Sequence, residues 1–308
     1  MTFEKLLEEY FFARQLRPDT QDCYRTAVNQ FTHWRDELPA EVTPHTVLEW
    51  RSYLLNARCI KPVSWNHYMR HLRALYNFAI EQGLLTQFTN PFVKTSLRES
   101  RRRKKTLSRE QIQASRKVLN HFIEQENTRR RYRSPLYPAW FWLTMVETFN
   151  YTAIRLNQLL HLRIMDIDLK NDTLFICSEG SKSHDEHIIP IASRLRPYLE
   201  QLLVQAEARG MRAGDQLFNI NRFSRRTRRQ GKVMTENQVS YFFAKLSDTC
   251  HSRFSPHRYR HTVATELMQK PEQNLYVTQK LLGHRDIKVT LSYIEHNVEM
   301  LRSCVERD

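Results

Sequence analysis

The chain has 308 residues, which is enough for two domains of ordinary size. Because 41% of the residues are apolar and 26% are charged, the composition predicts folded cores and excludes both a disordered polymer and a membrane protein. The formal net charge of +15 favours a polyanionic partner, with an acidic membrane surface or solubility alone as the alternatives. The six glycines are too scattered for a phosphate-binding loop, so enzymes that hold ATP or NAD in such a loop are excluded.

The five cysteines are odd in number, widely spaced and without a Cys-x-x-Cys pair. This pattern indicates neither a zinc ribbon nor a disulfide framework, and it is typical of reduced thiols in a cytosolic protein. The N-terminus carries acids before a short apolar run, so we expect no signal peptide. No stretch has the apolar length of a membrane span, and the predicted localisation is cytoplasmic.

The first third of the chain is rich in helix signals. Asp19 or Thr20, Thr43 and Ser64 are candidate N-caps, and Gly83 is a candidate C-terminal stop. Apolar residues recur at helical spacing after each cap. The sequence therefore predicts a small all-α domain over residues 1–96, with helices near 3–14, 19–34, 43–54 and 64–83.

A basic segment without aromatic residues follows and predicts an interdomain linker over residues 97–106. Three basic clusters are candidate contacts to a polyanion's phosphates, and a solvated charge run is the alternative reading of each. The clusters are Arg101, Arg102, Arg103, Lys104 and Lys105; Arg129, Arg130 and Arg131; and Arg225, Arg226, Arg228 and Arg229.

The second domain is predicted over residues 107–308. Ser108 caps its first helix, and two buried helices within 138–164 are joined near Tyr151. The hydrophobic period then shortens, so short strands at 173–178 and 187–191 form a β-hairpin with a polar tip. Helical patterns resume at 193–209 and 235–250.

The last sixty residues carry the densest chemical signal. Ser255 caps a helix whose first turn holds His257 and Arg260 on one face, at the positive end of the helix dipole. A helix ends at Gly283, and a further helix is expected to carry Tyr293. A His and an Arg at a helix N-terminus can form a phosphate-oxygen site, whereas a lone Tyr on an amphipathic helix is usually a core residue.

These segments resemble a known family. PHRYRH followed by LLGHRDIKVTLSYIEH is similar to the second conserved box of the tyrosine recombinases, the λ-integrase-like and Xer-like enzymes. TAIRLNQL is similar to their first box and supplies Arg155, and GSKSHDEHIIPI is similar to their β-hairpin and supplies Lys182. The resemblance covers essentially the whole chain, because the N-terminal helices look like the family's core-binding domain.

The chain departs from the family pattern in three places. Ala153 stands in place of the usual Gly, and Gln158 stands in place of the usual Glu, which affects the packing around the first box. The hairpin turn is longer and more acidic than in many members, so His184 or His187 could compete with Lys182 for its role.

The resemblance implies transfer of a DNA phosphodiester to the hydroxyl of Tyr293. Arg155, Arg260 and His284 would donate hydrogen bonds to the non-bridging oxygens, and each such donor commonly contributes roughly 3–4 kcal/mol. A Tyr has a normal pKa of about 10, and the surrounding cations are expected to lower it. The product would be a 3′-phosphotyrosyl bond, which requires no ATP and no other cofactor.

The two proton-transfer roles are less determined. His257 is either the proton acceptor or a phosphate ligand, and Lys182 is the expected donor to the leaving 5′ oxygen. His257 and His261 are four apart and could bind zinc, but the motif lacks the Glu of a metalloprotease and a third ligand. We therefore expect no metal.

The predicted fold is mainly α with a small β-hairpin or three-stranded sheet: an all-α core-binding domain and an α+β catalytic domain that close as a C-shaped clamp on duplex DNA. The resemblance implies a homotetramer acting through a Holliday junction, with the C-terminal tail, residues 299–308, docked on a neighbouring protomer. A second recombinase or an accessory protein could take part.

The expected activity is site-specific recombination by an Xer-like or mobile-element enzyme associated with the bacterial nucleoid. The helices begin almost at Met1, which leaves no room in this sequence for an arm-binding domain ahead of the core-binding domain. Integration, excision, inversion and dimer resolution remain open, as does the DNA target. The rival classes are a type IB topoisomerase-like enzyme and a recombinase-derived DNA-binding protein without activity.

Overall fold

The computed structural model describes residues 1–86, 89–99, 104–129, 134–177, 179, 186–224 and 232–294. The chain divides into two compact units, residues 1–102 and 103–308, which we call the N-terminal unit and the C-terminal unit. Each unit is described by itself. No helix in the described part of the chain is both long and apolar enough to cross a bilayer.

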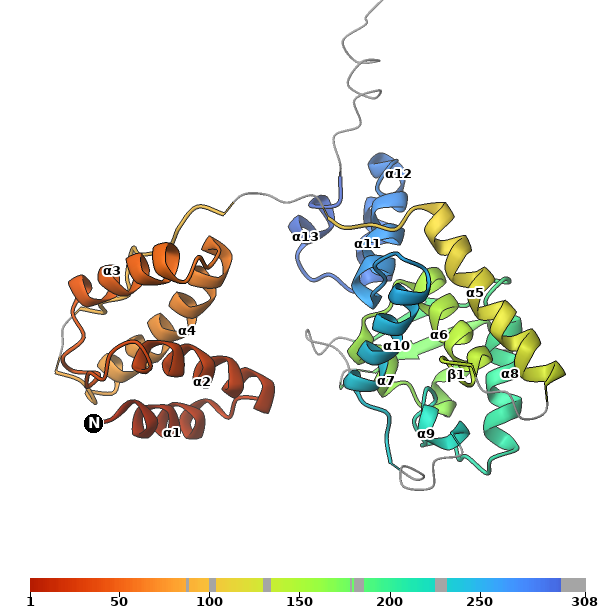
Figure 1. Ribbon diagram of the computed structural model, residues 1–308, viewed down its shortest axis with the longest axis horizontal. Coiled ribbons are helices and arrows are strands. Elements are labelled where there is room, and N and C mark those ends of the chain that lie inside the picture. The colour runs from red at the N-terminus through yellow and green to blue at the C-terminus, as the bar shows by residue number, and fades with distance from the viewer. Residues whose placement is uncertain are drawn as a thin grey trace, which may run out of the picture. The chain divides into compact units, whose positions relative to one another are not determined.

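The N-terminal unit is an all-α bundle in its described residues (Figure 1). Helix α4 packs against both α1 and α2, and large aromatic side chains such as Phe31, Trp50 and Trp65 fill the space between the helices. The helical elements are α1 (Phe3–Arg14), α2 (Pro18–Thr32), α3 (Pro44–Ser52), the π-helical turn η1 (Tyr53–Ala57) and α4 (Pro62–Glu81).

Two of these helices begin earlier than the sequence predicts. Helix α2 starts at Pro18 rather than after Asp19 or Thr20, and α4 starts at Pro62 rather than after Ser64. Proline suits the first helical position because its φ is already helical and its missing N–H would have no partner there. The prolines therefore set these two starts, and neither helix has a side-chain cap.

The beginning of the expected linker is packed on the N-terminal unit. The indole of Trp65 donates to the carbonyl of Thr95 over 2.8 Å. Asn66 exchanges two hydrogen bonds of 2.8 Å with the backbone of Leu97 and also donates to Glu99. Residues 95–99 are thus held along α4, and 100–103 lie outside the described residues.

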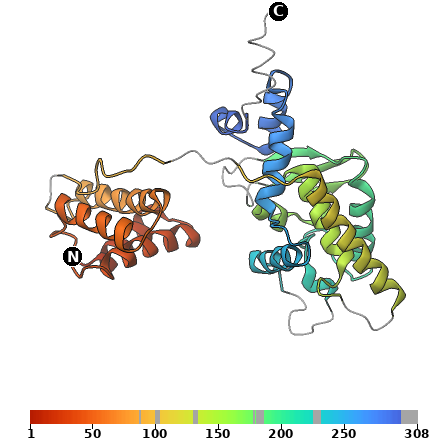
Figure 2. The same cartoon turned by 45° about the horizontal axis from the view of Figure 1, so that its top comes forward.

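The C-terminal unit is arranged around α6, which contacts α5, α8 and α11 (Figure 2). Its elements are α5 (Arg109–Thr128), α6 (Ala139–Thr152), α7 (Leu156–His161), the 3-10 turn η2 (Ile164–Asp166), β1 (Ile167–Asp168), β2 (Thr173–Ile176), β3 (His187–Pro190), α8 (Arg196–Glu207), α9 (Ile220–Phe223), α10 (Glu236–Thr249), α11 (Pro256–Leu267), α12 (Pro271–Leu282) and α13 (Ile287–Leu291).

A buried ion pair joins α5 to α6. Arg116 donates from Nε and Nη2 to the two oxygens of Glu147, over 2.6 and 2.7 Å. The Glu147 side chain is 1% exposed, so Arg116 takes the place of water as the partner of its oxygens. The start of α5 is tied to α11 as well, because the Leu107 N–H donates to the Thr262 hydroxyl over 2.8 Å.

The three strands form one antiparallel sheet in the order β1-β2-β3. Leu174 lies opposite Ile189, and both are fully buried, whereas Phe175 and Ile188 on the other face are exposed. Buried and exposed residues thus alternate every two residues along these strands, which is the pattern from which the sequence predicts a hairpin. The pairing of β2 with β3 confirms this hairpin. The residues between these strands, 178 and 180–185, lie outside the described residues.

Candidate active site

The carbonyl group of Leu282 brings two arginines together. It accepts a hydrogen bond of 3.1 Å from Nη1 of Arg155 and one of 2.7 Å from Nη2 of Arg260. Nη1 of Arg260 donates to the carbonyl of Ala153 over 2.7 Å. The turn after α6, helix α11 and the C-terminal end of α12 therefore meet at these guanidinium groups.

Backbone conformation explains one departure from the family pattern. Ala153 has a φ of 52°, in the left-handed region that glycine adopts more readily. An alanine there costs roughly 1 kcal/mol more than glycine. The conformation is nevertheless kept, because it directs the Ala153 carbonyl to Arg260 and places Arg155 at the start of α7.

Gln158, which stands where the family usually has Glu, makes the same backbone contact that a Glu would make. The side-chain oxygen of Gln158 accepts from the backbone N–H of Arg155 over 3.0 Å, as a glutamate oxygen would. The amide nitrogen of Gln158 is buried without a hydrogen-bond partner. Glutamine therefore preserves the helix start that positions Arg155, at the expense of one buried unsatisfied donor.

His284 orients Arg260. Its Nε2 lies 3.1 Å from Nη2 of Arg260, and its Nδ1 lies 2.9 Å from the hydroxyl of Thr290. Because a guanidinium only donates, Nε2 accepts and Nδ1 carries the ring proton. Burial, then Arg260, Arg155 and Lys104, lower the pKa of His284 to about 4, so the ring is neutral. The expectation that His284 points a donor at phosphate is not met in this arrangement.

Tyr293 follows α13 instead of lying on it. The helix ends at Leu291, and the hydroxyl of Ser292 donates to the carbonyl of Val289 over 2.5 Å. The Tyr293 side chain is 4% exposed. Burial raises its pKa, and this outweighs Arg260 and Arg155, which lower it. The expected lowering of the tyrosine pKa is therefore wrong for the protein without DNA.

The hydroxyl of Tyr293 lies beside a cation and a proton acceptor. The charge of Arg260 acts on this hydroxyl, and Nδ1 of His261 lies 3.1 Å from its oxygen. A neutral imidazole has one nitrogen without a proton, so Nδ1 of His261 can accept the tyrosine proton in the tautomer protonated at Nε2. Burial, then Lys104, His257 and Arg260, lower the pKa of His261 to about 4, which keeps this ring neutral.

The sequence indicated His261 only as a possible zinc ligand and did not predict its contact with Tyr293. The available signal was its position, one residue after Arg260 and four after His257 on α11. Among the described residues of the C-terminal unit, no three His, Cys, Asp or Glu side chains are grouped so that they could hold a metal.

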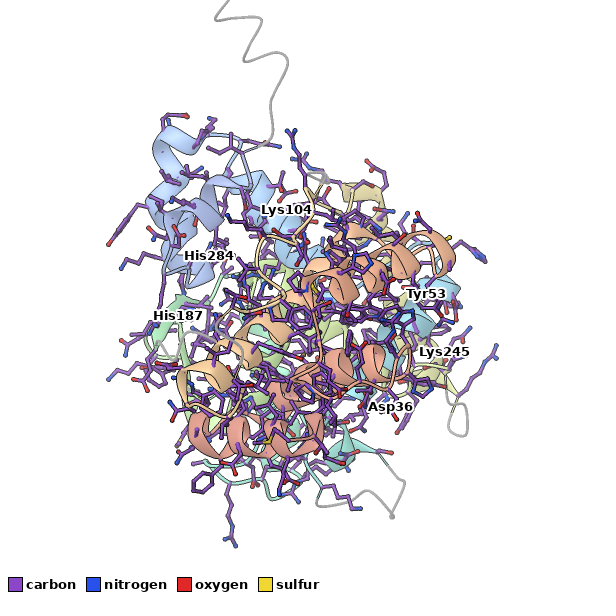
Figure 3. All side chains as sticks on the ribbon, turned by 90° about the vertical axis from the view of Figure 1, so that its left-hand side faces the viewer. Asp36, Tyr53, Lys104, His187, Lys245 and His284 are labelled. Atoms are coloured by element: carbon purple, nitrogen blue, oxygen red, sulfur yellow. The ribbon has the colours of Figure 1, made fainter. Side chains whose placement is uncertain are left out.

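Lys104 also reaches the tyrosine. Its Nζ lies 3.3 Å from the centroid of the Tyr293 ring and donates to the Ser292 hydroxyl over 2.7 Å. Burial, and then the charge of Arg260, lower the pKa of Lys104. Figure 3 shows Lys104 and His284 on the same side of the unit, beside the C-terminal helices. Lys104, which the sequence predicts as a phosphate contact, therefore contacts Tyr293 in this structure.

An open basin of about 470 Å³ adjoins these residues. Exposed His257 lies in it, and the His257 and His261 rings have centroids 6.4 Å apart. The basin is strongly basic and is lined by Lys104, Lys105, Arg253, Phe254, Ser255, His257, Arg258 and His261. Its size and charge suit an anionic group.

The remaining predicted residues fall into two sets. Arg129 is the exposed C-cap of α5, and His187 on β3 packs against Gly283, where an added Cβ would lie 3.1 Å from its ring. The other set lies outside the described residues: Arg101, Arg102, Arg103, Arg130, Arg131, Lys182, His184, Arg225, Arg226, Arg228, Arg229 and the tail 299–308.

Comparison with known proteins identifies the family. Residues 117–300 match the phage integrase family, and residues 3–84 match the N-terminal SAM-like domain of phage integrases. A structure of the Tn1549 transposon integrase in complex with transposon right end DNA has the same fold, with a TM-score of 0.71. The two chains are 16% identical, and the similarity covers 100% of this chain and 99% of that one. The predicted fold class is confirmed.

Two relatives from Pseudomonas carry the inferred name tyrosine recombinase XerC. The Pseudomonas syringae protein is 41% identical over 303 residues, 98% of this chain and 63% of its own length. The Pseudomonas aeruginosa protein is 40% identical over 306 residues, 98% of this chain and 71% of its own length. The chain thus spans less than two thirds of the first relative. The chain described here by its sequence and structure belongs to the phage integrase family, the family of the tyrosine recombinases.

Proposed function

We propose that the chain is a site-specific DNA recombinase that cleaves and rejoins duplex DNA through a 3′-phosphotyrosyl bond at Tyr293. The observation that carries this proposal is the buried Tyr293 hydroxyl between Arg260 and His261, at the edge of a basic basin. The names of the Pseudomonas relatives support it.

In the proposed reaction, the Tyr293 oxygen attacks the phosphorus and the 5′ oxygen leaves. Arg155 and Arg260 would stabilise the charge on the non-bridging oxygens. Among the described contacts, Arg155 uses one side-chain N–H, toward Leu282, so its guanidinium retains donors for phosphate. The reverse attack by a 5′ hydroxyl restores the diester, so the step conserves the bond and needs no ATP.

Two protons must move in this step. His261 is the proposed acceptor of the Tyr293 proton, since the two atoms are 3.1 Å apart and the ring is neutral. Exposed His257 is then best placed as a phosphate ligand in the basin. Lys182 remains the proposed donor to the leaving 5′ oxygen.

The proposed partner is duplex DNA, bound by both units with the help of the three basic clusters. Four protomers would act on two sites through a Holliday junction, with residues 299–308 docked on a neighbour and a second recombinase or accessory protein as optional partners. We place the enzyme with the bacterial nucleoid, as an Xer-like or mobile-element recombinase.

A covalent-capture experiment tests the activity. The protein is incubated with a pool of nicked duplexes of randomised sequence, and complexes that survive SDS are recovered and sequenced. We expect a covalent complex enriched in one site, and we expect Tyr293→Phe to abolish it while retaining DNA binding. An SDS-resistant complex that persists in this variant would overturn the assignment of the nucleophile.

A plasmid assay with two copies of the recovered site separates the rival classes. A recombinase yields exchanged products. If the wild-type protein forms the covalent complex but gives only relaxed plasmid, the topoisomerase-like reading replaces the proposal. Binding without any covalent complex would indicate a recombinase-derived DNA-binding protein.

A further inference from the structure

Three side chains with metal-binding atoms converge in the N-terminal unit, apart from every residue assigned above. Cys23 lies on α2, and His67 and His71 lie on α4. These two helices pack against each other (Figure 1). All three side chains are half-buried, so they are partly shielded from solvent and still reachable by an ion.

The ligand atoms are close enough for one ion. The sulfur of Cys23 and one ring nitrogen of each histidine all lie within 4.8 Å of one another. Ligand atoms of a tetrahedral zinc ion with Zn–S and Zn–N bonds of ordinary length are roughly 3.3–3.6 Å apart. The cluster would therefore have to close by about 1 Å on binding.

The two histidines are spaced for shared coordination. They are four residues apart, so they lie on one face of α4, and their ring centroids are 4.4 Å apart. Nδ1 of His71 lies 2.7 Å from the carbonyl of His67. A carbonyl can only accept, so Nδ1 carries the proton and Nε2 keeps its lone pair, which is the usual tautomer of a metal-bound histidine.

Packing against α2 further restricts the orientation of the His71 ring. The ring of Tyr24, next to Cys23 on α2, lies edge-on to His71 with centroids 4.7 Å apart. Tyr24 is buried and hydrogen-bonds to the hydroxyl of Tyr10 over 3.0 Å. The His71 ring is thus held from two sides, which lowers the entropy that it would lose on binding.

We propose that Cys23, His67 and His71 form a binding site for a divalent transition metal of the zinc class, which cross-links α2 to α4. One thiolate and two imidazoles are a ligand set that zinc accepts, with water as the fourth ligand at this half-buried position. Binding would release the Cys23 thiol proton and stabilise the N-terminal unit. The sequence did not predict this site, because the cysteine and the histidines come from separate helices.

Cobalt titration of the full-length, reduced protein tests the site, because tetrahedral Co²⁺ bound to a thiolate has a characteristic charge-transfer absorption. We expect one equivalent of Co²⁺ to produce this absorption and Zn²⁺ to displace it. Zn²⁺ at about 100 times its Kd should raise the melting temperature of the N-terminal unit by roughly 10–20 °C. Neither readout depends on recombinase activity.

Variants identify the ligands. Cys23→Ser should abolish the charge-transfer absorption, whereas Cys59→Ser, at an exposed cysteine of the same unit, should leave it unchanged. His67→Gln should weaken Co²⁺ binding on the order of tenfold or more and covers the case in which Cys23→Ser fails to fold. The proposal is wrong if the wild-type protein shows no absorption at one equivalent, or if either ligand variant binds like the wild type.

Discussion

At the scale of single residues, the proposed chemistry depends on where the protons around Tyr293 lie. Nδ1 of His261 lies 3.1 Å from the tyrosine oxygen, while burial holds the tyrosine pKa above its ordinary value. Cations alone therefore do not produce a phenolate in the unliganded protein. The proposed nucleophile, Tyr293, needs a proton acceptor, and the described structure offers His261 at hydrogen-bond distance.

We predict that His261→Ala lowers the rate of covalent-complex formation about 100-fold, the ordinary contribution of a general base. His261→Asn should show a similar loss, because an amide oxygen can accept a hydrogen bond but is too weak a base to take the proton. Both rates are measured by single-turnover cleavage of the nicked duplex, with DNA binding measured in parallel. Equal rates for His261→Ala and wild type would transfer the acceptor role to another group, such as His257.

The pH profile distinguishes proton transfer from a structural role. Because the pKa of His261 is about 4, the ring is unprotonated at neutral pH and is free to take a proton from the tyrosine. It loses this capacity as the pH falls through 4. Wild-type cleavage should therefore change little between about pH 6 and 8. In His261→Ala the rate should rise about tenfold per pH unit, because the raised tyrosine pKa lies above this range. Parallel profiles would contradict a proton-transfer role.

At the scale of elements, local signals predicted several helix ends correctly. Thr43, Ser108 and Ser255 are N-caps whose hydroxyls accept backbone hydrogen bonds, and Gly283 ends α12 in the left-handed conformation. These features depend on neighbours in sequence. The end of α13 before Tyr293 was not predicted, because Lys104 contacts Ser292 and the tyrosine ring from a distant segment.

The C-terminal end of α12 positions the two arginines of the site, and a substitution at Gly283 tests this role. Gly283→Ala keeps a φ of 59° and brings a methyl group 3.1 Å from the His187 ring, next to the Leu282 carbonyl that binds both arginines. We predict a loss of about 1–2 kcal/mol in the free energy of unfolding and a slower cleavage rate.

Gly210→Ala is the matched control, because Gly210 has a φ of 65° and no atom within 4 Å of an added Cβ. It should show a similar or smaller loss of stability, measured by urea unfolding, and unchanged cleavage. If both variants cleave DNA at the wild-type rate, the end of α12 does not control the arginines.

At the scale of the whole molecule, the net charge of +15 should appear as a steep dependence of DNA affinity on salt. Replacing Arg225, Arg226, Arg228 and Arg229 by alanine should reduce the slope of log K against log salt by about 0.9 for each phosphate that the variant no longer neutralises. Arg196→Gln is the control, since Asp172 and Glu200 already neutralise that side chain. An unchanged slope in the fourfold variant would remove this cluster from the interface.

Assembly is a second property of the whole molecule. We predict that deletion of residues 299–308 leaves binding to a single site intact and prevents the pairing of two sites, because the tail is proposed to dock on a neighbouring protomer. Gel-shift and sedimentation measurements on one-site and two-site DNA separate these steps. Normal pairing and strand exchange by the truncated chain would disprove the docking role.

The sequence by itself determined the family, the mainly helical fold with a small sheet and the order of the motifs, because hydrophobic period, caps and short motifs are local. Only the tertiary structure decided the raised pKa of Tyr293, the neutral His284 that orients Arg260, and the contacts of His261 and Lys104. The cluster of Cys23, His67 and His71 belongs to the same class. Burial and hydrogen-bond direction depend on segments far apart in the chain, and residue spacing does not encode them.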